Sequence, residues 1–347
     1  MKNLMLLTLD YPPDEGGVAR YLAGLWGALP PDMAGEVLRL KVGTRRLEWL
    51  GLWFRIWRSV RERRPGGLVI SHLLPMGYFA LKLKLLCRLP YVVIVHGTDL
   101  KRARLSAWKR FWATRILRSA ALVVANSAFT RDLASGFGVE ADRLTVVYPG
   151  VNATLSDPEN VPRQPHRLLS VCRLVKRKGV LRVLRILPSL LTKFPDLKYV
   201  IAGDGPESSN LKSLATELGV ATAVEFAGPV SDAERERLYA SASVFVLPGT
   251  DEPDDIEGFG IVFIEAGLRG LAVVAGNVGG TAEAVLDGRT GLLIKPGDSA
   301  GLTSALERLL AHSEEARLMG LAGRARALAD FTWGTSAKKL AERLAKL

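Results

Sequence analysis

Two carboxylates and two cations of this sequence have the types and spacing to bind a charged ligand that carries hydroxyl groups. Glu257 and Glu265 lie eight positions apart in EGFGIVFIEAGLRG, a stretch made almost entirely of glycine and apolar residues. A buried acid needs a partner, and a carboxylate can accept two hydrogen bonds from paired sugar hydroxyls. Arg173 and Lys178 lie five positions apart in SVCRLVKRKGV. An arginine fork with a lysine point charge suits a diphosphate, although a solvated basic loop is the commoner fate of such charges.

The first half of the chain carries further candidates. His96 in YVVIVHGTDL follows an apolar run and could donate to a ligand hydroxyl, but a packed histidine with a satisfied hydrogen bond fits its position equally well. Gly16 and Gly17 in DYPPDEGGVARYL either aim helix amides at a phosphate or form a plain turn. In the second half, the acidic stretch TDEPDDIEG has no His or Cys beside it, so we expect a solvated loop and no metal site.

The elements that position these residues alternate between short apolar runs and amphipathic stretches. Near-continuous apolar strands that alternate with helices are typical of parallel sheets covered on both faces. The predicted fold class is therefore α/β, with two doubly wound, Rossmann-like domains in series. The predicted strands are LMLLTL, EVLRLKV, GLVISHL, YVVIVHG, ALVVANS and LTVVYPG in the first half, and RLLSVCRL, KYVIAGDG, VEFAGPV, VFVLPG, LAVVAGN and GLLIKPG in the second.

A chain of 347 residues exceeds what one hydrophobic core usually holds. The segment 152–166 is rich in Pro, Asn and Asp, and we place the interdomain linker there. The predicted domains are residues 1–155 and 160–330, and we expect the last helix, in 331–347, to pack back on the first domain. Ligands of open parallel sheets bind beyond the carboxyl ends of the strands, so the expected site is a cleft between the domains.

The net charge is concentrated in the first half. Residues 1–150 contain 23 Lys and Arg against 11 Asp and Glu, a charge of +12, whereas residues 151–347 contain 24 of each. Six of the seven tryptophans lie in the basic half. Basic residues beside aromatic ones suit the headgroup region of an anionic membrane. In the alternative, the tryptophans pack on their own sheet and the arginines are merely solvated. The predicted acceptor or membrane surface contains Trp49, Trp53, Trp57, Arg55, Arg58, Trp108 and Trp112.

Other features bear on the compartment. Cys87 and Cys172 are far apart and form no metal or redox spacing, which suits a reducing compartment. The first residues, MKNLMLLTLDYPP, look like a strand and not a signal peptide, because Asp10 interrupts the apolar run. No uncharged apolar run approaches the roughly 18 residues that cross a bilayer. We therefore expect a cytoplasmic protein that associates peripherally with the inner face of the membrane.

A family resemblance covers nearly the whole chain. The stretch EGFGIVFIEAGLRGLAVVAGNVGGTAEAVLDGRTGLLI resembles the signature of the family-4 retaining glycosyltransferases of GT-B fold, with its paired glutamates. The blocks CRLVKRKGV, IAGDGPE, VEFAGPVSD, VYPGVN and ANSAFTRD match further parts of that family in order. The resemblance implies a retaining, metal-independent hexosyltransferase with no cofactor other than its nucleotide-sugar donor. The first domain would bind the acceptor and the second would bind the donor.

The resemblance also implies roles for the matching residues of the donor site. Arg173 and Lys178 would grip the donor diphosphate, and Glu265 would hold the nucleotide ribose. The charged clamp would stabilise the leaving diphosphate, which would help to accept the acceptor's proton on the same face.

The remaining roles concern the donor sugar and the acceptor. The donor sugar hydroxyls would be held by Glu257 and by the amides of Gly258, Phe259 and Gly260. Gly16 and Gly17 would approach the phosphate and the acceptor, and His96 would reach the donor sugar near its reactive carbon. His96 and Glu257 therefore join Arg173 and Lys178 as predicted catalytic residues.

The donor and the acceptor are predicted from a finer likeness. DDIEGFGIVFIEAG is similar to mannosyltransferases that use GDP-mannose, including the phosphatidylinositol mannosyltransferases, so the predicted reaction moves mannose to a lipid-linked or membrane-associated acceptor. Three alternatives stay open: a UDP-sugar-dependent transferase of glycan or lipopolysaccharide assembly, a non-catalytic sugar-nucleotide-binding protein, and a sugar-nucleotide epimerase. A nucleic-acid-binding protein would share the basic charge but would not explain the four charged residues at strand ends, so we expect no nucleic-acid partner.

Overall fold

The computed structural model describes residues 1–14, 16–40, 46–152 and 163–347. The chain divides into two compact units, which are described separately. Unit 1 comprises Met1–Gly150, Pro253–Gly258 and Trp333–Leu347, and unit 2 comprises Val151–Glu252 and Phe259–Thr332. Most of the predicted linker, residues 153–162, lies outside the described residues.

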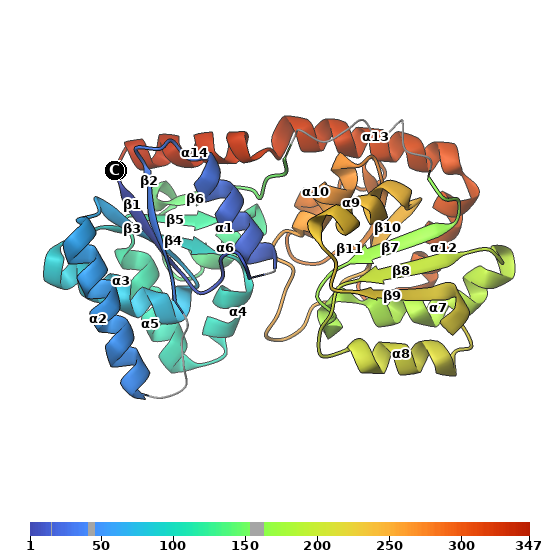
Figure 1. The fold of residues 1–347 in the computed structure, drawn as a ribbon, viewed down its shortest axis with the longest axis horizontal. Helices are drawn as coiled ribbons and strands as arrows, with labels where there is room; N and C mark the ends of the chain where they lie inside the picture. Colours follow the sequence, from blue (N-terminus) through green and yellow to red (C-terminus); the bar gives the residue numbers. More distant parts are fainter. Residues whose placement is uncertain (15, 41–45, 153–162) are drawn as a thin grey trace. The chain divides into compact units, whose positions relative to one another are not determined.

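Unit 1 is built on a six-stranded parallel sheet in the order β2-β1-β3-β4-β5-β6 (Figure 1). Its central strands are apolar on both faces and fully buried, as expected of a sheet that helices cover on both sides. The strands are β1 Leu4–Thr8, β2 Ala34–Arg39, β3 Gly67–Ser71, β4 Tyr91–Val95, β5 Leu122–Ala125 and β6 Leu144–Val146.

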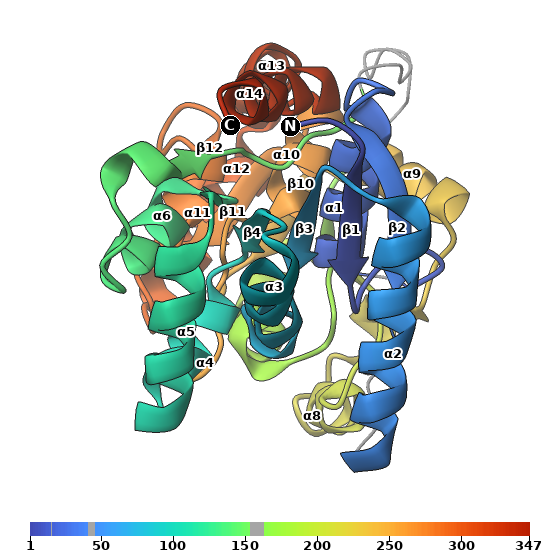
Figure 2. The ribbon, with the colours of Figure 1, turned by 90° about the vertical axis from the view of Figure 1, so that its left-hand side faces the viewer.

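Helices cover both faces of this sheet. On one face α3 lies between α2 and α5 (Figure 2), and on the other α1 packs against α14. The last helix thus belongs to unit 1, where Ser336 Oγ donates to the carbonyl of Tyr148 at 2.7 Å. The helices are α1 Gly17–Ala28, α2 Arg46–Arg63, α3 Leu73–Cys87, α4 Thr98–Arg104, α5 Ala107–Ser119, α6 Ala128–Ser135, the short 3₁₀ turn Ala141–Arg143 and α14 Trp333–Ala345.

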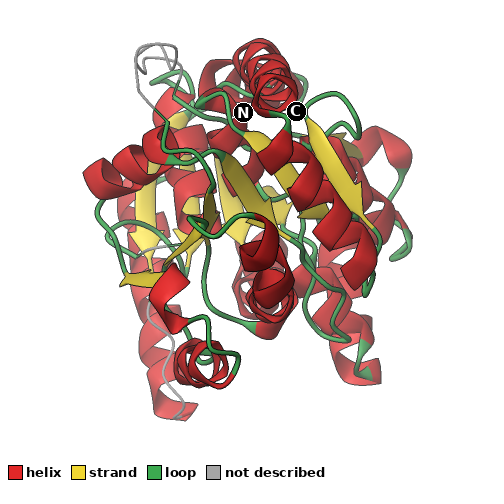
Figure 3. Ribbon diagram, turned by 90° about the vertical axis from the view of Figure 1, so that its right-hand side faces the viewer, coloured by secondary structure: helices red, strands yellow, loops and turns green. Residues whose placement is uncertain are grey.

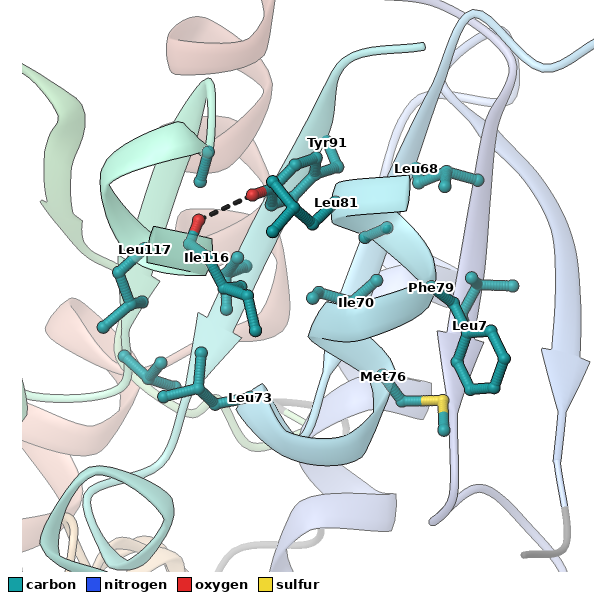
Figure 4. Packing of buried hydrophobic residues seen from close by; sticks show 14 of the residues in the cluster. Leu7, Leu68, Ile70, Leu73, Met76, Phe79, Leu81, Tyr91, Ile116 and Leu117 are labelled. Carbon is teal, nitrogen blue, oxygen red and sulfur yellow. Dashed lines mark hydrogen bonds between the residues drawn. The ribbon is translucent and has the colours of Figure 1, made fainter. Parts of the chain in front are cut away.

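The larger core of unit 1 lies between the sheet and α3 and α5. Leu73, Met76 and Phe79 of α3 pack on alternate residues of β1 and β3, including Leu7 and Ile70 (Figure 4).

A buried hydrogen bond runs through this core. Tyr91 of β4 donates its hydroxyl to the carbonyl of Ile116 on α5 at 2.6 Å. Because a buried hydroxyl without a partner is costly, this bond ties α5 to the sheet.

Unit 2 repeats the architecture with a six-stranded parallel sheet in the order β12-β11-β10-β7-β8-β9. Helices lie on either side of its strands (Figure 3). The strands are β7 Arg167–Val171, β8 Lys198–Ala202, β9 Val224–Gly228, β10 Val244–Leu247, β11 Ala272–Gly276 and β12 Gly291–Ile294. The helices are α7 Val180–Lys193, α8 Ser208–Glu217, α9 Asp232–Ser241, α10 Ile261–Leu268, α11 Thr281–Ala284, α12 Ser299–Ala311 and α13 Ser313–Asp330, with 3₁₀ turns at Lys176–Lys178 and Ala221–Ala223.

Each sheet has one place where the strand order reverses. In unit 1 the reversal falls between β1 and β3, and in unit 2 it falls between β7 and β10. Ligands of such sheets bind beyond the carboxyl ends of the strands at these switch points. The prediction of two doubly wound α/β domains is confirmed, and each predicted strand overlaps an observed one.

Candidate functional site

The two cations of unit 2 follow β7, at its switch point. Arg173 lies in the loop directly after the strand and is exposed, whereas Lys178 ends a 3₁₀ turn and is 8% exposed. Gly179 closes the turn in the left-handed conformation with φ 72°. A Cβ on Gly179 would lie 2.2 Å from the carbonyl oxygen of Pro248, which follows β10, so only glycine allows this approach.

Neighbouring groups fix the position of this turn against the loop after β10. The amide of Thr250 donates to the carbonyl of Arg177 at 2.8 Å. Arg182 of α7 donates to the carbonyl of Pro248 at 3.0 Å and to that of Asp298 at 3.0 Å. Lys178 is thus held at the point where the strand order reverses, between β7 and β10.

Glu265 lies in the second turn of α10, the helix that follows the loop after β10. Gly260 precedes the helix in the left-handed region with φ 89°. The half-buried carboxylate of Glu265 accepts a hydrogen bond from the hydroxyl of the buried Tyr239 at 3.1 Å, which orients it. Phe259 is buried and its ring packs on Phe331 at 5.4 Å between centroids, so only its backbone amide suits the role predicted for it.

Glu257 and Gly258 belong to unit 1, which corrects the prediction that all four charged residues lie on one domain. The segment Pro253–Gly258 is fastened to unit 1 by Thr98, whose Oγ1 donates to Asp255 Oδ1 at 2.8 Å and to the carbonyl of Ile256 at 3.1 Å. A Cβ on Gly258 would lie 2.1 Å from the carbonyl oxygen of His96. Closeness in sequence to Glu265 was therefore a poor guide to where Glu257 packs.

His96 follows β4 and lies within hydrogen-bond reach of the buried Ser71, at 3.0 Å from Nε2 to Oγ. Its backbone amide donates to Asp99 Oδ1 at 3.1 Å, and its ring meets Tyr21 edge-on at 5.5 Å. Burial, with a smaller contribution from the nearby His72, lowers the pKa of His96 to about 3. The ring is therefore neutral at physiological pH and can exchange a hydrogen bond with a ligand without carrying charge.

Burial raises the pKa of Asp99, while hydrogen bonds from the amides of His96 and Leu100 act in the opposite direction. Asp99 lies three positions after His96, and its type and spacing alone predicted no role for it. Here it fixes the turn that carries His96.

The remaining glycines of the prediction lie where the sequence placed them. Gly16, with φ 148°, and Gly17 open α1 at the carboxyl end of β1, and both are exposed.

The tryptophans of α2 pack on their own domain, as the alternative reading expected. Trp49 and Trp53 stack on Phe79 of α3 at 6.0 and 6.1 Å between centroids, and Trp57 also packs against the core. Their face is therefore not the exposed one. Arg55, Arg58, Arg61 and Arg63 of α2 are exposed, and Arg58 pairs with Glu62 at 2.7 Å.

Other apolar side chains, on α2, on α5 and at Leu105 directly after α4, are exposed instead. The exposed fractions are 66% for Leu50, 60% for Phe54, 62% for Leu105, 65% for Trp108 and 53% for Phe111. Trp112 is half-buried and meets Tyr78 edge-on at 5.5 Å. We call Leu50, Phe54, Leu105, Trp108 and Phe111, with the exposed cations Arg55, Arg58, Lys109 and Arg110, the basic apolar face.

Sequence reasoning missed Asp10 and His72, which follow β1 and β3 of unit 1. His72 Nε2 lies 3.0 Å from Asp10 Oδ2. The signal that singled out His96, a polar residue directly after a buried strand, also applies to His72 in GLVISHL. It missed Tyr239 as well, since an isolated tyrosine in a helix carries no positional signal.

Within the described residues, no three His, Cys, Asp or Glu side chains group as a metal site would. No helix among those residues is long and apolar enough to span a membrane.

Known families match both halves of the chain. The family described as "Glycosyl transferases group 1" matches residues 152–326, and "Glycosyltransferase Family 4" matches residues 16–155. The GDP-mannose-dependent alpha-(1-6)-phosphatidylinositol monomannoside mannosyltransferase of Mycolicibacterium smegmatis is 31% identical over 98% of each chain. The protein of the same name from Mycobacterium tuberculosis is 30% identical, over 99% of this chain and 98% of the mycobacterial chain.

Solved structures share the fold. Anabaena HepE in complex with UDP and glucose superimposes with a TM-score of 0.83 at 21% identity over the whole of both chains. The sequence matches and the shared fold agree: this chain belongs to the glycosyltransferases of group 1 and family 4.

Proposed function

We propose that this protein transfers mannose from GDP-mannose, with retention of configuration, to a lipid-linked acceptor at the inner face of the membrane. The observation that carries the proposal is the likeness, over 98% of both chains, to a mannosyltransferase whose name specifies that donor and a phosphatidylinositol monomannoside acceptor. The placement of Lys178 and Glu265 around the β7–β10 switch point supports the same donor site.

Each donor group meets residues suited to it. Arg173 and Lys178 bind the diphosphate, Glu265 binds the ribose, and the amides at the start of α10, beginning with Gly260, favour anionic and hydroxyl groups. As the bond from the anomeric carbon to the diphosphate breaks, the acceptor oxygen bonds to the same face. The acceptor's proton passes to the leaving diphosphate, whose charge the two cations stabilise. No metal ion or cofactor takes part in the proposed reaction.

Residues of unit 1 serve the sugar and the acceptor. Glu257 and the amide of Gly258 bind sugar hydroxyls. The neutral ring of His96 approaches the anomeric carbon. Gly16 and Gly17 place the amides of α1 beside a phosphate.

The basic apolar face suits an anionic bilayer as the source of the acceptor. Leu50 and Phe54 lie in the first half of α2, and Trp108 and Phe111 lie in the first turns of α5. A helix that follows a parallel strand begins at the carboxyl edge of the sheet, which is the edge that carries His96; α2 follows β2, and α5 follows β4 after the short helix α4. Exposed apolar side chains among cations combine shallow insertion with attraction to anionic lipid.

A donor panel tests the proposal directly. We would incubate the full chain with GDP-mannose, UDP-glucose or UDP-N-acetylglucosamine and with vesicles of phosphatidylcholine containing phosphatidylinositol or phosphatidylinositol monomannoside, with and without EDTA. We expect an α-linked mannolipid from GDP-mannose alone, unchanged by EDTA. Transfer only from a UDP sugar would replace the donor assignment, and a β-linked product would contradict retention. If vesicle binding depended neither on the salt concentration nor on the anionic lipid content, the proposed association with an anionic membrane would be wrong.

A further inference from the structure

The switch point of unit 1 carries a histidine–aspartate pair that the donor chemistry does not use. Asp10 follows β1 and His72 follows β3, the two strands between which the order of the sheet reverses. His72 Nε2 lies 3.0 Å from Asp10 Oδ2. Because ligands of open parallel sheets bind beyond such a reversal, this pair occupies the expected ligand position of unit 1.

The contact with Asp10 decides what the other ring nitrogen offers. An ionised carboxylate only accepts hydrogen bonds, so His72 Nε2 donates to Asp10. In the neutral ring Nδ1 then carries a lone pair and is an acceptor. Nδ1 is buried and accepts no hydrogen bond from any described residue. A buried acceptor without a partner is unfavourable, and in a native protein it calls for a ligand or a water.

Two more unfilled acceptors lie around His96, whose ring centroid is 6.3 Å from that of His72. Asn126, which follows β5 and is 8% exposed, has a buried Oδ1 that accepts from no described residue. Asp99 Oδ2 is buried near the amide of Leu73 but makes no hydrogen bond of ordinary geometry within the described chain. All three unfilled atoms accept, so the complementary ligand must donate several hydrogen bonds, as a polyol does.

The backbone of His72 gives a further reason to expect function. Its φ of 71° and ψ of 90° place a residue with a Cβ in a region that side chains disfavour. The strain persists only where the surroundings hold it, and such positions cluster at ligand sites. Here it turns the chain from β3 into α3 and brings the ring to Asp10.

We propose that the Asp10–His72 pair binds a hydroxyl of the acceptor's polyol headgroup, with His72 Nδ1 accepting the hydroxyl hydrogen. This rests on the proposed transferase function. Hydroxyls come from two sources, the donor sugar and the acceptor. The acceptor is assigned because α3, which begins after His72, packs against α2 and α5, the helices that carry most of the basic apolar face.

Steady-state kinetics separate the two sources. In His72→Gln the side-chain amide can keep the contact with Asp10 but loses the ring acceptor, whereas in His72→Asn a carbonyl oxygen replaces Nδ1 and the residue tolerates positive φ. With GDP-mannose and vesicles that contain phosphatidylinositol monomannoside, we expect His72→Gln to lower transfer about tenfold through the acceptor KM. The donor KM and the hydrolysis of GDP-mannose by water stay within about twofold, and His72→Asn recovers most of the transfer.

His166 provides a matched control, because it also pairs with an aspartate, Asp196, at 2.7 Å. It lies directly before β7, at the amino end of a strand of unit 2, where no ligand is expected. We expect His166→Gln to leave the rate of transfer, the acceptor KM, the donor KM and the hydrolysis of GDP-mannose unchanged. Equal losses of transfer, donor affinity and hydrolysis in His72→Gln would assign the hydroxyl to the donor sugar and overturn the proposal. Unchanged transfer in His72→Gln would overturn it too.

A binding measurement keeps the test independent of catalysis. The chain has four histidines, so ¹⁵N-labelled ring signals can be assigned by substitution. We would titrate the full chain with myo-inositol 1-phosphate and expect the Nδ1 signal of His72 to shift while those of His166 and His312 do not. An unmoved His72 signal contradicts the acceptor site even if transfer is observed. A shifted signal in a protein that transfers nothing supports the site and contradicts the proposed function.

Discussion

Unit 1 and unit 2 are built on the same plan, six parallel strands covered by helices, yet their surfaces differ in charge and polarity. Residues 1–150 carry a net charge of +12 and the remainder carries none; the segments 253–258 and 333–347 of unit 1 contribute −3 and +3 and cancel. The exposed aromatic and leucine side chains of α2 and α5 belong to unit 1. One fold therefore presents two different surfaces, and the strand-end loops and outer helix faces make the difference.

The sites also differ in how they are held. In unit 2 the cations sit on a turn fixed by close backbone contacts, such as that between Gly179 and Pro248. In unit 1 side chains fix one another, through Asp10 and His72 and through Thr98 and Asp255, while Asp99 accepts from the backbone amide of His96. A backbone-built cradle suits a phosphate, which accepts from amides, whereas side-chain acceptors suit hydroxyls.

The largest effect is expected at the cradle of unit 2. Lys178→Ala removes a buried positive charge from the leaving diphosphate, and we expect transfer to fall about 100- to 1000-fold, as when a stabilising donor is removed from other active sites. Vesicle binding stays unchanged. Lys176→Ala, an exposed cation on the same turn, serves as the control and retains activity. Equal losses in both variants would mean that general charge matters and not the buried position.

The backbone of the same turn gives the next largest effect, measured as the free energy of unfolding in urea. Gly179→Ala forces a Cβ against the carbonyl of Pro248 and costs about 3 kcal/mol. Gly219→Ala is matched, because Gly219 has a φ of 70° but no atom within 4 Å of the added carbon. It costs about 1 kcal/mol. Similar costs at the two positions would show that the approach to Pro248 does not matter.

Two neighbours on α2 separate packing from membrane contact in unit 1. Trp53→Ala removes a ring stacked on Phe79 and costs about 2 kcal/mol of stability. Phe54→Ala, at 60% exposure, leaves stability within about 0.5 kcal/mol but weakens binding to anionic vesicles. Urea denaturation measures the stability of each variant, and vesicle sedimentation measures its membrane binding. A Phe54 variant that binds vesicles normally would argue against the basic apolar face.

The smallest effect concerns the pH dependence of stability in unit 1. The pKa of His96 is about 3 in the folded chain, against an ordinary value near 6.5, so below pH 6.5 only the unfolded chain takes up the proton. This contribution to stability is lost as the pH falls from about 6.5 towards 3, by about 1 kcal/mol per pH unit at most, because the residue keeps partial exposure. His96→Gln flattens this slope between pH 6 and 4, whereas His312→Gln, at an exposed position, leaves it unchanged. Equal slopes in wild type and His96→Gln would contradict the burial of the ring.

Strand positions were predictable because parallel strands buried on both faces read as short apolar runs, as YVVIV in β4 and VFVL in β10 do. The strand-end rule then placed Arg173, Lys178 and His96 correctly along the chain. The packing of Glu257 was not predictable, since it depends on Thr98 and Asp255, which are 157 residues apart. Nor could spacing alone tell which face of α2 is exposed, because Trp49 and Trp53 are covered by Phe79 from another helix.

The central claim is that unit 2 binds the donor and unit 1 binds the membrane. Hydrogen exchange of the full chain, with GDP-mannose or with anionic vesicles, tests this claim most directly. With GDP-mannose we predict slower exchange in residues 173–179 and 260–266 and no change in residues 50–58 and 105–111. With vesicles we predict slower exchange in residues 50–58 and 105–111 and no change in residues 173–179 and 260–266. Protection of residues 50–58 by the nucleotide sugar, with none in residues 173–179, would contradict the assignment of the donor to unit 2 and of the membrane to unit 1.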